Sequence, residues 1–360
     1  MTQRTEQKIM QNWEGDIAKP LVSISCITYN HEDYIAEAID SFLMQETDFP
    51  FEIVVRDDCS TDNTAEIIRE YAKRYPHLIK PIYEKENQYS KGVRPTPVTF
   101  KKSVGEYIAL CEGDDYWIDP GKLQIQVDLM RENPECHLSF HPADEVIDGD
   151  FAGNVWGNLN ADNKIFTDSE MITSIPSHDC PTASMVFRRE VMDPPPNFFA
   201  SAPTGDIFLQ HLGSLNGGAL FIARNMSAYR VGHHGSWSTK MLERNSKSVA
   251  SMIENRTQHV LANIKSLEEM KNSVDRKHSK DIDKLISLKL YGLSRVYLEN
   301  GMDIEYKKTI LQARKFYMPT TIVNSILYNF RFAPNVFRYL VWLRNILSFW
   351  YSEKGVSDKK

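Results

Sequence analysis

The hydrophobic positions of this chain fall into short continuous runs separated by stretches with helical spacing. Four apolar runs of strand length occur in the first 133 residues, and the stretches between and after them carry apolar residues every three or four positions. Short runs predict buried strands, and the wider spacing predicts amphipathic helices. Alternating strands and helices predict an α/β fold, with a mostly parallel sheet covered by helices on both faces. The predicted strands are Leu21–Thr28, Phe51–Arg56, Leu78–Tyr83 and Tyr107–Cys111.

The pattern is less regular beyond Asn133. Phe151–Ile175 is weakly patterned, and we expect it to be an excursion over a site. The elements predicted in this part are a strand and turn at 137–148, a strand at Ala183–Arg188, a helix over Gly205–Leu212, and a closing strand pair, Ala219–Ala223 with Met226–Arg230.

The chain becomes helical and charged from about Lys240. Ile282–Leu298 and Tyr306–Phe316 predict amphipathic helices. We therefore divide the chain into a polar lead-in (1–19), an α/β domain (20–240) and a helical C-terminal extension (241–360). In the segment 336–351, polar and apolar residues separate on a helical projection. Such a helix fits peripheral contact with a membrane. It also fits docking on the main domain or on a second subunit, and in the latter case the protein would be a homo-oligomer.

Composition narrows the class of protein. The chain has 360 residues, 42% of them hydrophobic, which supports a proper core, and a formal net charge of -6 without a long basic run. Nucleic acid is therefore not an expected partner. The five cysteines form no C-x-x-C pair, which indicates reduced thiols in the cytoplasm. We expect neither a signal peptide nor a membrane-spanning helix. The predicted location is cytoplasmic, or the inner face of the cell membrane if the 336–351 helix binds there.

The most informative stretch follows the fourth predicted strand. It reads Glu112-Gly113-Asp114-Asp115, so three carboxylates follow a buried strand directly. Clustered acids repel one another and are costly to desolvate, and a divalent cation would remove that cost. Oxygen ligands suit Mg²⁺ or Mn²⁺, which usually share their coordination with substrate phosphates. The simpler alternative is an Asp-rich turn.

Two further polar strings follow predicted strands, Thr28–Asp33 and Asp57–Thr64. Ligands of parallel sheets bind beyond the carboxyl ends of the strands. Three polar strings at three such ends therefore predict a binding site along one edge of the sheet.

These strings also resemble a known family. V-S-I-S-C-I-T-Y-N-H-E-D-Y-I, V-V-R-D-D-C-S-T-D-N-T and E-G-D-D-Y-W, in this order, are similar to the inverting glycosyltransferases with the GT-A fold (family 2-like), many of which build bacterial capsules, O-antigens and other surface polysaccharides. The resemblance covers about residues 20–240. It implies a GT-A sheet, a nucleoside-diphosphate sugar donor (most often a UDP-sugar), a hydroxyl acceptor on a glycan or lipid-linked glycan, and Mn²⁺ or Mg²⁺.

The resemblance also implies roles for individual residues at the donor site. The nucleotide pocket would be lined by the first string, the paired acids would meet the base, and a basic group would come from the loop after the third strand. The residues concerned are Thr28, Tyr29, Asn30, Glu32, Asp57, Asp58 and Lys91.

The remaining implied roles concern the metal and the proton. Asp115 would be a direct metal ligand, and Asp114 would hold the ribose, the metal or its water shell; Glu112 departs from the first acid of the family motif. Asp206 matches the acid that deprotonates the acceptor. His233 and His234 lie one or two positions beyond the expected metal-side histidine, so either could fill that role.

Two alternatives remain open. A sugar nucleotidyltransferase has a similar sheet, although its usual Gly-rich loop is replaced here by T-Y-N-H-E-D. A decayed transferase domain could serve as a non-catalytic scaffold or binding protein. A Rossmann dehydrogenase is disfavoured because no G-x-G-x-x-G follows the first strand.

Overall fold

The computed structural model describes residues 4–159, 162–176, 179–233, 239, 248–318 and 321–339. The chain divides into two compact units, Met1–Arg244 and Asn245–Lys360.

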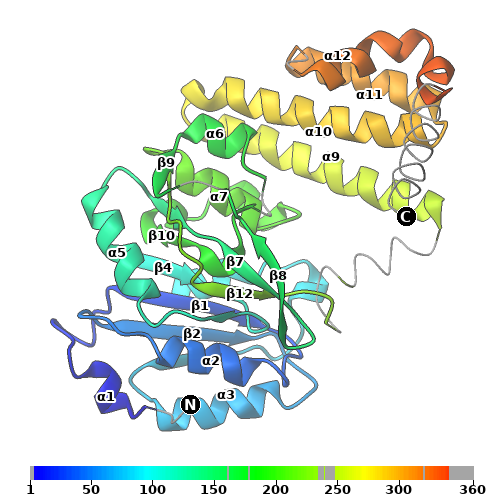
Figure 1. Ribbon diagram of the computed structural model, residues 1–360. Helices are drawn as coiled ribbons and strands as arrows, with labels where there is room; N and C mark the ends of the chain where they lie inside the picture. The colour runs from blue at the N-terminus through cyan, green and yellow to red at the C-terminus, as the bar shows by residue number, and fades with distance from the viewer. Residues whose placement is uncertain are drawn as a thin grey trace, which may run out of the picture. The chain divides into compact units, whose positions relative to one another are not determined.

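The first unit is built on an eight-stranded mixed sheet with the order β3-β2-β1-β4-β10-β6-β11-β9 (Figure 1). The first four strands in this order are parallel, and β10 lies antiparallel between β4 and β6. The strands are β1 (Val22–Thr28), β2 (Phe51–Asp57), β3 (Ile79–Tyr83), β4 (Tyr107–Leu110), β6 (Leu138–Phe140), β9 (Lys164–Phe166), β10 (Val186–Arg188) and β11 (Ala219–Phe221). The four strands predicted before residue 112 are therefore all present, within one residue of their expected ends.

Strands β1, β2 and β4 are buried on both faces, which is the usual situation in a parallel sheet. Apolar residues fill most of their positions, and the two serines of β1 are paired. Ser23 donates a hydrogen bond to Glu52 at 2.6 Å, and Ser25 donates one to Thr99 at 2.6 Å. The core therefore leaves these strand hydroxyls satisfied.

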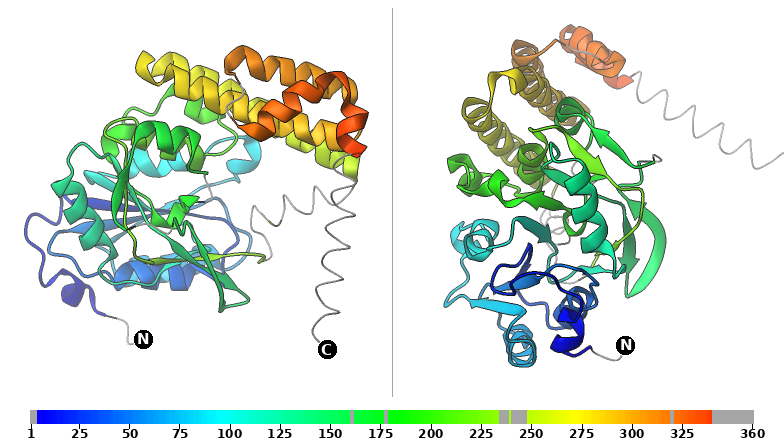
Figure 2. Two further views of the ribbon diagram at one scale, coloured as in Figure 1. Left: turned by 45° about the horizontal axis from the view of Figure 1, so that its top comes forward. Right: turned by 90° about the vertical axis from the view of Figure 1, so that its left-hand side faces the viewer.

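Helices cover both faces of this sheet (Figure 2). Helix α2 begins directly after the first polar string, and its buried side carries Ile35, Ile39 and Phe42 at helical spacing. The helices of the unit are α1 (Glu6–Met10), α2 (Ile35–Leu43), α3 (Thr64–Arg74), α4 (Thr96–Lys102), α5 (Lys122–Glu132), α6 (Asp168–Thr173) and α7 (Asp206–Ser214).

A second, smaller sheet has the order β5-β12-β7-β8. Its strands are β5 (Tyr116–Trp117), β7 (Ala143–Ile147), β8 (Asp150–Trp156) and β12 (Ser227–Arg230). The predicted closing strand pair is wrong in its pairing, because β11 joins the large sheet and β12 joins the small one. The three residues of β11 are buried, and the strand lies between β6 and the edge strand β9.

Residues 4–19, expected to be a lead-in, pack on the first unit. Ile9 belongs to the main hydrophobic core, and Trp13 donates a hydrogen bond from its indole to Thr47 at 3.0 Å. Glu6 accepts backbone hydrogen bonds from His77 and Leu78. The sequence did not indicate these contacts, because most residues of this segment are polar and only a few are apolar.

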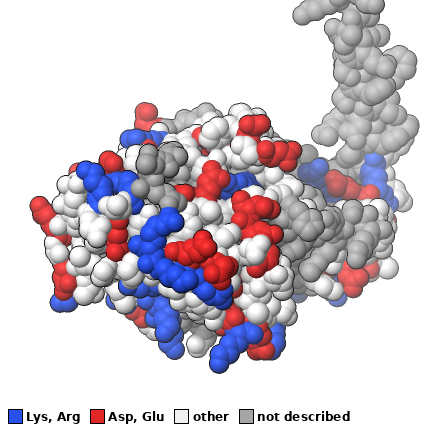
Figure 3. Space-filling view, turned by 90° about the horizontal axis from the view of Figure 1, so that it is seen from below, with Lys and Arg blue, Asp and Glu red and all other residues white. Residues whose placement is uncertain are grey.

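Charged side chains of both signs are interspersed on the face of the molecule shown in Figure 3. On this face, no large field of Lys and Arg stands apart from Asp and Glu.

The second unit is helical, as predicted. Helix α10 packs on both α9 and α11, and its apolar side is fully buried. Tyr306 donates a hydrogen bond to the carbonyl of Leu327, which ties α11 to α12. No helix in the described part of the chain is long and apolar enough to cross a membrane. The helices are α9 (Val249–Ser273), α10 (Ser279–Glu299), α11 (Asp303–Phe316) and α12 (Ile322–Asn329).

Lys122 is fully buried at the start of α5. Its ammonium donates a hydrogen bond to Gln126 at 2.6 Å and lies 4.3 Å from the centre of the Trp117 ring. Both partners are neutral, so the charge of the ammonium is poorly compensated. Burial lowers the pKa of Lys122 to about 7.

This burial predicts a pH-dependent stability. Between pH 7 and the ordinary lysine pKa of about 10.4, the unfolded chain binds a proton that the folded chain lacks, so the free energy of unfolding rises with pH. We expect Lys122→Met to remove this rise, as measured by urea unfolding at pH 7, 8, 9 and 10. The exposed Lys102→Met is the control and should follow the unchanged protein. Parallel pH profiles for Lys122→Met and the unchanged protein would contradict the prediction.

Candidate active site

The three polar strings meet at the carboxyl ends of β1, β2 and β4. Thr28 pairs with Asp57 in the register of the two strands. The Asp58 N–H donates to the Thr28 carbonyl at 3.0 Å, and the Gly113 N–H donates to the Ile27 carbonyl at 2.9 Å. Backbone hydrogen bonds therefore hold the three strings side by side at one edge of the sheet.

Gly113 allows the acidic turn to approach β1. A Cβ atom at this position would lie 2.8 Å from both Cβ and Oγ1 of Thr28 and 3.1 Å from Cδ1 of Ile35. No side chain fits there without moving the strand or the helix that follows it. The glycine is thus required by close packing.

Asn30 and Glu32 hold the first string against the second. Asn30 lies in the left-handed region with φ 56°, and its side-chain oxygen accepts the Thr61 N–H at 2.8 Å. Glu32 accepts hydrogen bonds from both the backbone and the side chain of Asn63. The structure thus places these two predicted nucleotide-site residues in contacts that shape the loop. Tyr29 lies beside them, half-buried.

The paired acids Asp57 and Asp58 differ in their surroundings. Both are buried. Asp57 accepts hydrogen bonds from the backbone and the hydroxyl of Ser60, within its own turn. Asp58 accepts from the Arg56 guanidinium at 2.8 Å and from the backbone N–H groups of Gln88 and Tyr89 at 3.0 and 2.9 Å. Asp58 therefore anchors the loop that follows β3.

That loop carries two cations with different positions. Lys91 is exposed and forms an ion pair with Glu86 at 2.6 Å. Arg94 is partly buried, which lowers its pKa, while Tyr89 and Asp206 act in the opposite direction. Of the two, Arg94 is the cation close to the predicted base.

Asp114 lies between two imidazoles. Its Oδ2 is 3.1 Å from Nε2 of His233 and 3.8 Å from Nε2 of His31. Burial disfavours the charged carboxylate, but the His233 hydrogen bond and the charges of both histidines hold the pKa of Asp114 below its usual value. The structure brings His233 to the acidic turn; His234 lies outside the described residues.

Asp115 points away from these imidazoles, into the protein. Its Oδ1 accepts the backbone N–H of Arg230 at 2.9 Å, and its Oδ2 is buried without a hydrogen-bond partner among the residues that the structure describes. Burial, together with the neighbouring charge of Asp114, raises the pKa of Asp115 well above its usual value.

Arg230 joins three parts of the site. Besides its backbone contact with Asp115, its guanidinium donates to the Asp114 carbonyl and to the Glu37 carboxylate. The guanidinium also lies over the rings of Tyr34 and Tyr116, at 5.0 and 4.5 Å from their centres. Strand β12 is therefore fastened to the acidic turn and to α2.

Asp206 approaches the acidic turn from α7. It is the first residue of that helix and is partly exposed. Burial, followed by the charges of Asp114 and Asp206, raises the pKa of Glu112 to about 8. Burial also raises the pKa of Tyr229, and the charges of the same acids and of Asp115 add to that rise.

Sequence reasoning missed the contacts of His31, Tyr229 and Arg230. His31 stands within the first polar string, and Tyr229 and Arg230 end the predicted strand Met226–Arg230, but nothing in the sequence indicated that they would reach the acids. The positions of Tyr229 and Arg230 depend on β12 lying between β5 and β7, which is a long-range arrangement.

The donor set can be compared with the needs of a divalent cation. Within the part of the chain that the structure describes, no group of three or more His, Cys, Asp and Glu side chains is arranged to hold a metal ion. Asp114 with His233 offers one carboxylate oxygen and one imidazole nitrogen at the same point. This partial set fits an ion that takes its other ligands from water and phosphate oxygens.

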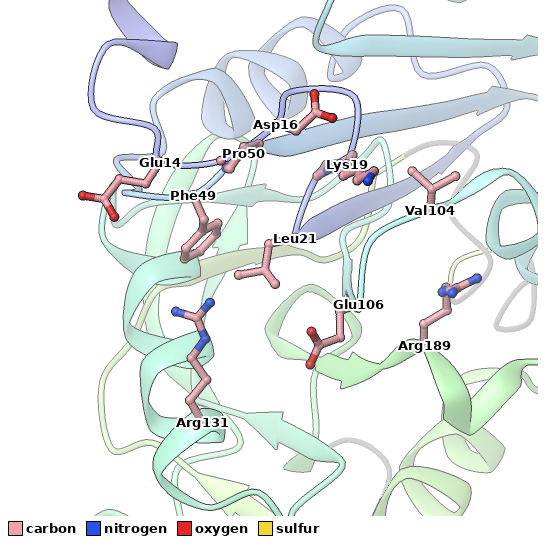
Figure 4. A pocket seen from close by; sticks show the side chains of 12 residues that line it. Glu14, Asp16, Lys19, Leu21, Phe49, Pro50, Val104, Glu106, Arg131 and Arg189 are labelled. Atoms are coloured by element: carbon pink, nitrogen blue, oxygen red, sulfur yellow. The ribbon is translucent and has the colours of Figure 1, made fainter.

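A cavity of about 440 Å³ lies elsewhere, at the amino ends of the strands (Figure 4). Leu21, Pro50 and Glu106, each preceding a strand of the parallel set, contribute to its wall. Charged side chains of both signs surround it. It is separate from the edge that carries the clustered acids.

The fold and the site define a class of protein. A parallel sheet that presents paired aspartates and an acidic turn at its carboxyl edge, continued by a strand of opposite direction, is the GT-A type of α/β fold. Residues 23–193, a little under half of the chain, match the family model "Glycosyl transferase family 2".

Relatives are similar over part of the chain. An uncharacterized protein of Mycobacterium tuberculosis is 37% identical over 238 residues, which are 62% of this chain and 62% of that protein. The poly(ribitol-phosphate) β-N-acetylglucosaminyltransferase TarS of Staphylococcus aureus is 37% identical over 97 residues, 26% of this chain and 16% of TarS. The chain thus spans about three fifths of the mycobacterial relative's length.

Solved structures share the fold. A crystal structure of residues 1–349 of S. aureus TarS in complex with UDP superposes with a TM-score of 0.56 at 18% identity, covering 88% of each chain. The mannosyltransferase PcManGT of Pyrobaculum calidifontis, in complex with GDP-Man and Mn²⁺, superposes with a TM-score of 0.51 at 13% identity, covering 97% of this chain and 90% of that one.

The packing of Gly113 yields a prediction. Gly113→Ala should lower the free energy of unfolding by about 1–3 kcal/mol, because the added methyl overpacks the contact with Thr28. Gly121→Ala is a matched control, since the nearest atoms to its Cβ would lie at 3.4 Å. Urea unfolding of both variants makes the comparison. Equal stability of the two variants would show that β1 and the acidic turn can separate without cost.

Proposed function

We propose that the protein transfers a sugar, with inversion, from a nucleoside-diphosphate sugar to a hydroxyl of a glycan or lipid-linked glycan. A UDP-sugar is the first candidate donor. The observation that carries the proposal is the convergence of the Asp114–His233 pair and Asp206 at the edge of the sheet that also holds Asp57. The match of residues 23–193 to the glycosyl transferase family 2 model supports it.

The donor nucleotide would bind over the loops after β1 and β2. An ionised carboxylate accepts hydrogen bonds only, which suits the imide N–H of uracil. The contacts of Asp58 with Arg56 and with the loop after β3 occupy it, so we assign the base contact to Asp57. Thr28, whose buried Oγ1 has no hydrogen-bond partner in the described ranges, would face the nucleotide. The complex of TarS with UDP supports a uridine donor.

The diphosphate end would lie at the acidic turn. Asp114 and His233 would hold a divalent cation there, and such an ion stabilises the negative charge that develops on a leaving diphosphate. Asp115 takes a different part in this proposal: through the Arg230 N–H it fixes β12, and with it the position of His233. Arg94, partly buried near Asp206, supplies a fixed positive charge for the phosphate groups.

Asp206 is the candidate general base. The start of α7 favours the ionised form through the helix dipole. The carboxylate would accept the proton of the acceptor hydroxyl while that oxygen attacks the anomeric carbon from the side opposite the diphosphate. One in-line displacement inverts the configuration at that carbon. The mechanism needs no second carboxylate as a nucleophile.

Replacement of Asp206 tests the proposed base. Asp206→Asn should lower the rate of sugar transfer, and of slow donor hydrolysis, by about 10²–10⁴-fold, which is the usual contribution of a general base. UDP affinity, measured by calorimetry, should change less than twofold. Donor turnover is followed as UDP release from a panel of UDP-sugars.

The matched control is Asp168→Asn, which replaces the aspartate that begins another helix, α6. It should leave turnover unchanged. Near-normal turnover in Asp206→Asn would exclude this residue as the base. Absence of turnover in the unchanged protein with every nucleotide sugar, despite tight UDP binding, would instead favour the scaffold alternative.

The cation assignment has a separate test that does not need turnover. We expect Mn²⁺ to strengthen UDP binding, and we expect Asp114→Asn and His233→Ala to reduce that gain at least tenfold. Binding in EDTA should be unaffected in both variants. His77→Ala is the control, because its ring pairs with Glu6 away from this edge. An equal loss with and without Mn²⁺ would mean that these side chains contact the nucleotide directly.

A further inference from the structure

The second unit exposes an unusual number of large apolar side chains. On α12, Ile322 is 80% exposed, and Val323 and Ile326 are exposed on the same side of the helix. Phe332, shortly after α12, is 77% exposed. Val336 and Tyr339, one helical turn apart, are exposed as well. Isolated exposed apolar residues need no explanation, but a set that recurs along three consecutive segments indicates a partner.

Helix α11 adds a stripe that combines apolar and basic residues. Ile304, Lys308, Leu311 and Lys315 follow one another at intervals of four, three and four, so they share one face of the helix. All four are exposed. The opposite side of α11, with Tyr306, Ile310 and Ala313, is buried in the unit.

The charge of this region is strongly one-sided. Between residues 306 and 351 the chain has seven Lys and Arg and no Asp or Glu, although it contains 42 basic and 48 acidic residues in total. The guanidinium of Arg331 lies 3.8 Å from the centre of the Tyr328 ring and 4.0 Å from that of Phe332. Arginine between aromatic rings beside exposed aliphatic residues is typical of groups placed at a lipid headgroup boundary.

From these observations we infer that the exposed side of α11 (Ile304, Lys308, Leu311, Lys315) and that of α12 with the residues after it (Ile322, Val323, Ile326, Arg331, Phe332), together called the α11–α12 surface, bind an anionic lipid bilayer. Apolar side chains would enter the boundary between headgroups and acyl chains, and the cations would contact the anionic headgroups. The sequence-based hypothesis placed membrane contact at 336–351. The inference adds α11 and α12, and it does not depend on the proposed function.

A second copy of this chain is a poorer occupant of the same surface. A twofold interface places the same patch of both subunits face to face. Here it would bring the basic residues of one copy against those of the other, and the acids that α11 and α12 contribute are Asp303, already paired with Arg338, and Glu305. Anionic lipid supplies the missing opposite charge.

Cosedimentation of the full chain with vesicles tests the inference. We expect binding to vesicles of phosphatidylcholine with 30% phosphatidylglycerol, weak binding to pure phosphatidylcholine, and a loss of binding in high salt. Ile322→Ser combined with Phe332→Ser should weaken the partition at least tenfold. Lys308→Glu combined with Lys315→Glu should abolish the preference for anionic vesicles. Phe151→Ser, at an exposed position in the first unit, is the matched control and should bind normally.

Three results would overturn the inference. One is an absence of binding to anionic vesicles. The second is normal binding by the Ile322→Ser/Phe332→Ser variant while Trp342→Ser combined with Trp350→Ser abolishes it, which would place the contact further along the chain. The third is a dimer in light scattering that the Ile322→Ser/Phe332→Ser variant converts to a monomer, which would make the surface an interface between copies. Thermal unfolding of each variant verifies that the fold is retained.

Discussion

The repulsion among the carboxylates that follow β4 is the constraint on which the site depends. Glu112, Asp114 and Asp115 lie within four consecutive positions, and the protein separates their environments. Asp114 receives two imidazoles, Asp115 receives the backbone N–H of Arg230, and Glu112 stays protonated more readily than an ordinary glutamate. Each acid is thereby stabilised in a different way, and only Asp114 presents its charge to histidine side chains.

Distant segments supply these stabilising groups. Arg230 and His233 come from the end of the first unit, 115 and 119 residues after the acids they contact. Folding of the small sheet therefore completes the site, because β12 has to lie between β5 and β7 before either residue reaches the acidic turn. The site is a property of both sheets of the first unit.

Much of the large sheet could be predicted because its signals are local. Apolar runs fixed the four parallel strands to within a residue, and the polar strings after them indicated the functional edge. The contacts among the acids could not be predicted. Asp114 and Asp115 are adjacent aspartates, so the sequence does not distinguish their roles. The difference comes from β12, where the Arg230 N–H donates to Asp115. The pairing of β11 with β12 was also wrong, because two short neighbouring strands give no signal of belonging to different sheets. The packing of residues 4–19 on the first unit was not predicted, because it depends on only a few apolar residues, chiefly Ile9 and Trp13.

The anchoring of the loop after β3 has a consequence for how donor preference can change. Asp58 holds Gln88 and Tyr89 in the loop that also carries Arg94, while the neighbouring Asp57 is the residue that we assign to the base. Two adjacent aspartates thus connect the region assigned to the base with the region assigned to the phosphates. A substitution that moves the backbone at one aspartate also moves the other aspartate, because a single peptide bond joins them. A change of nucleotide preference at this site would therefore require coordinated substitutions in both loops. A single replacement at Asp57 or Asp58 would reduce donor binding without changing which nucleotide is preferred.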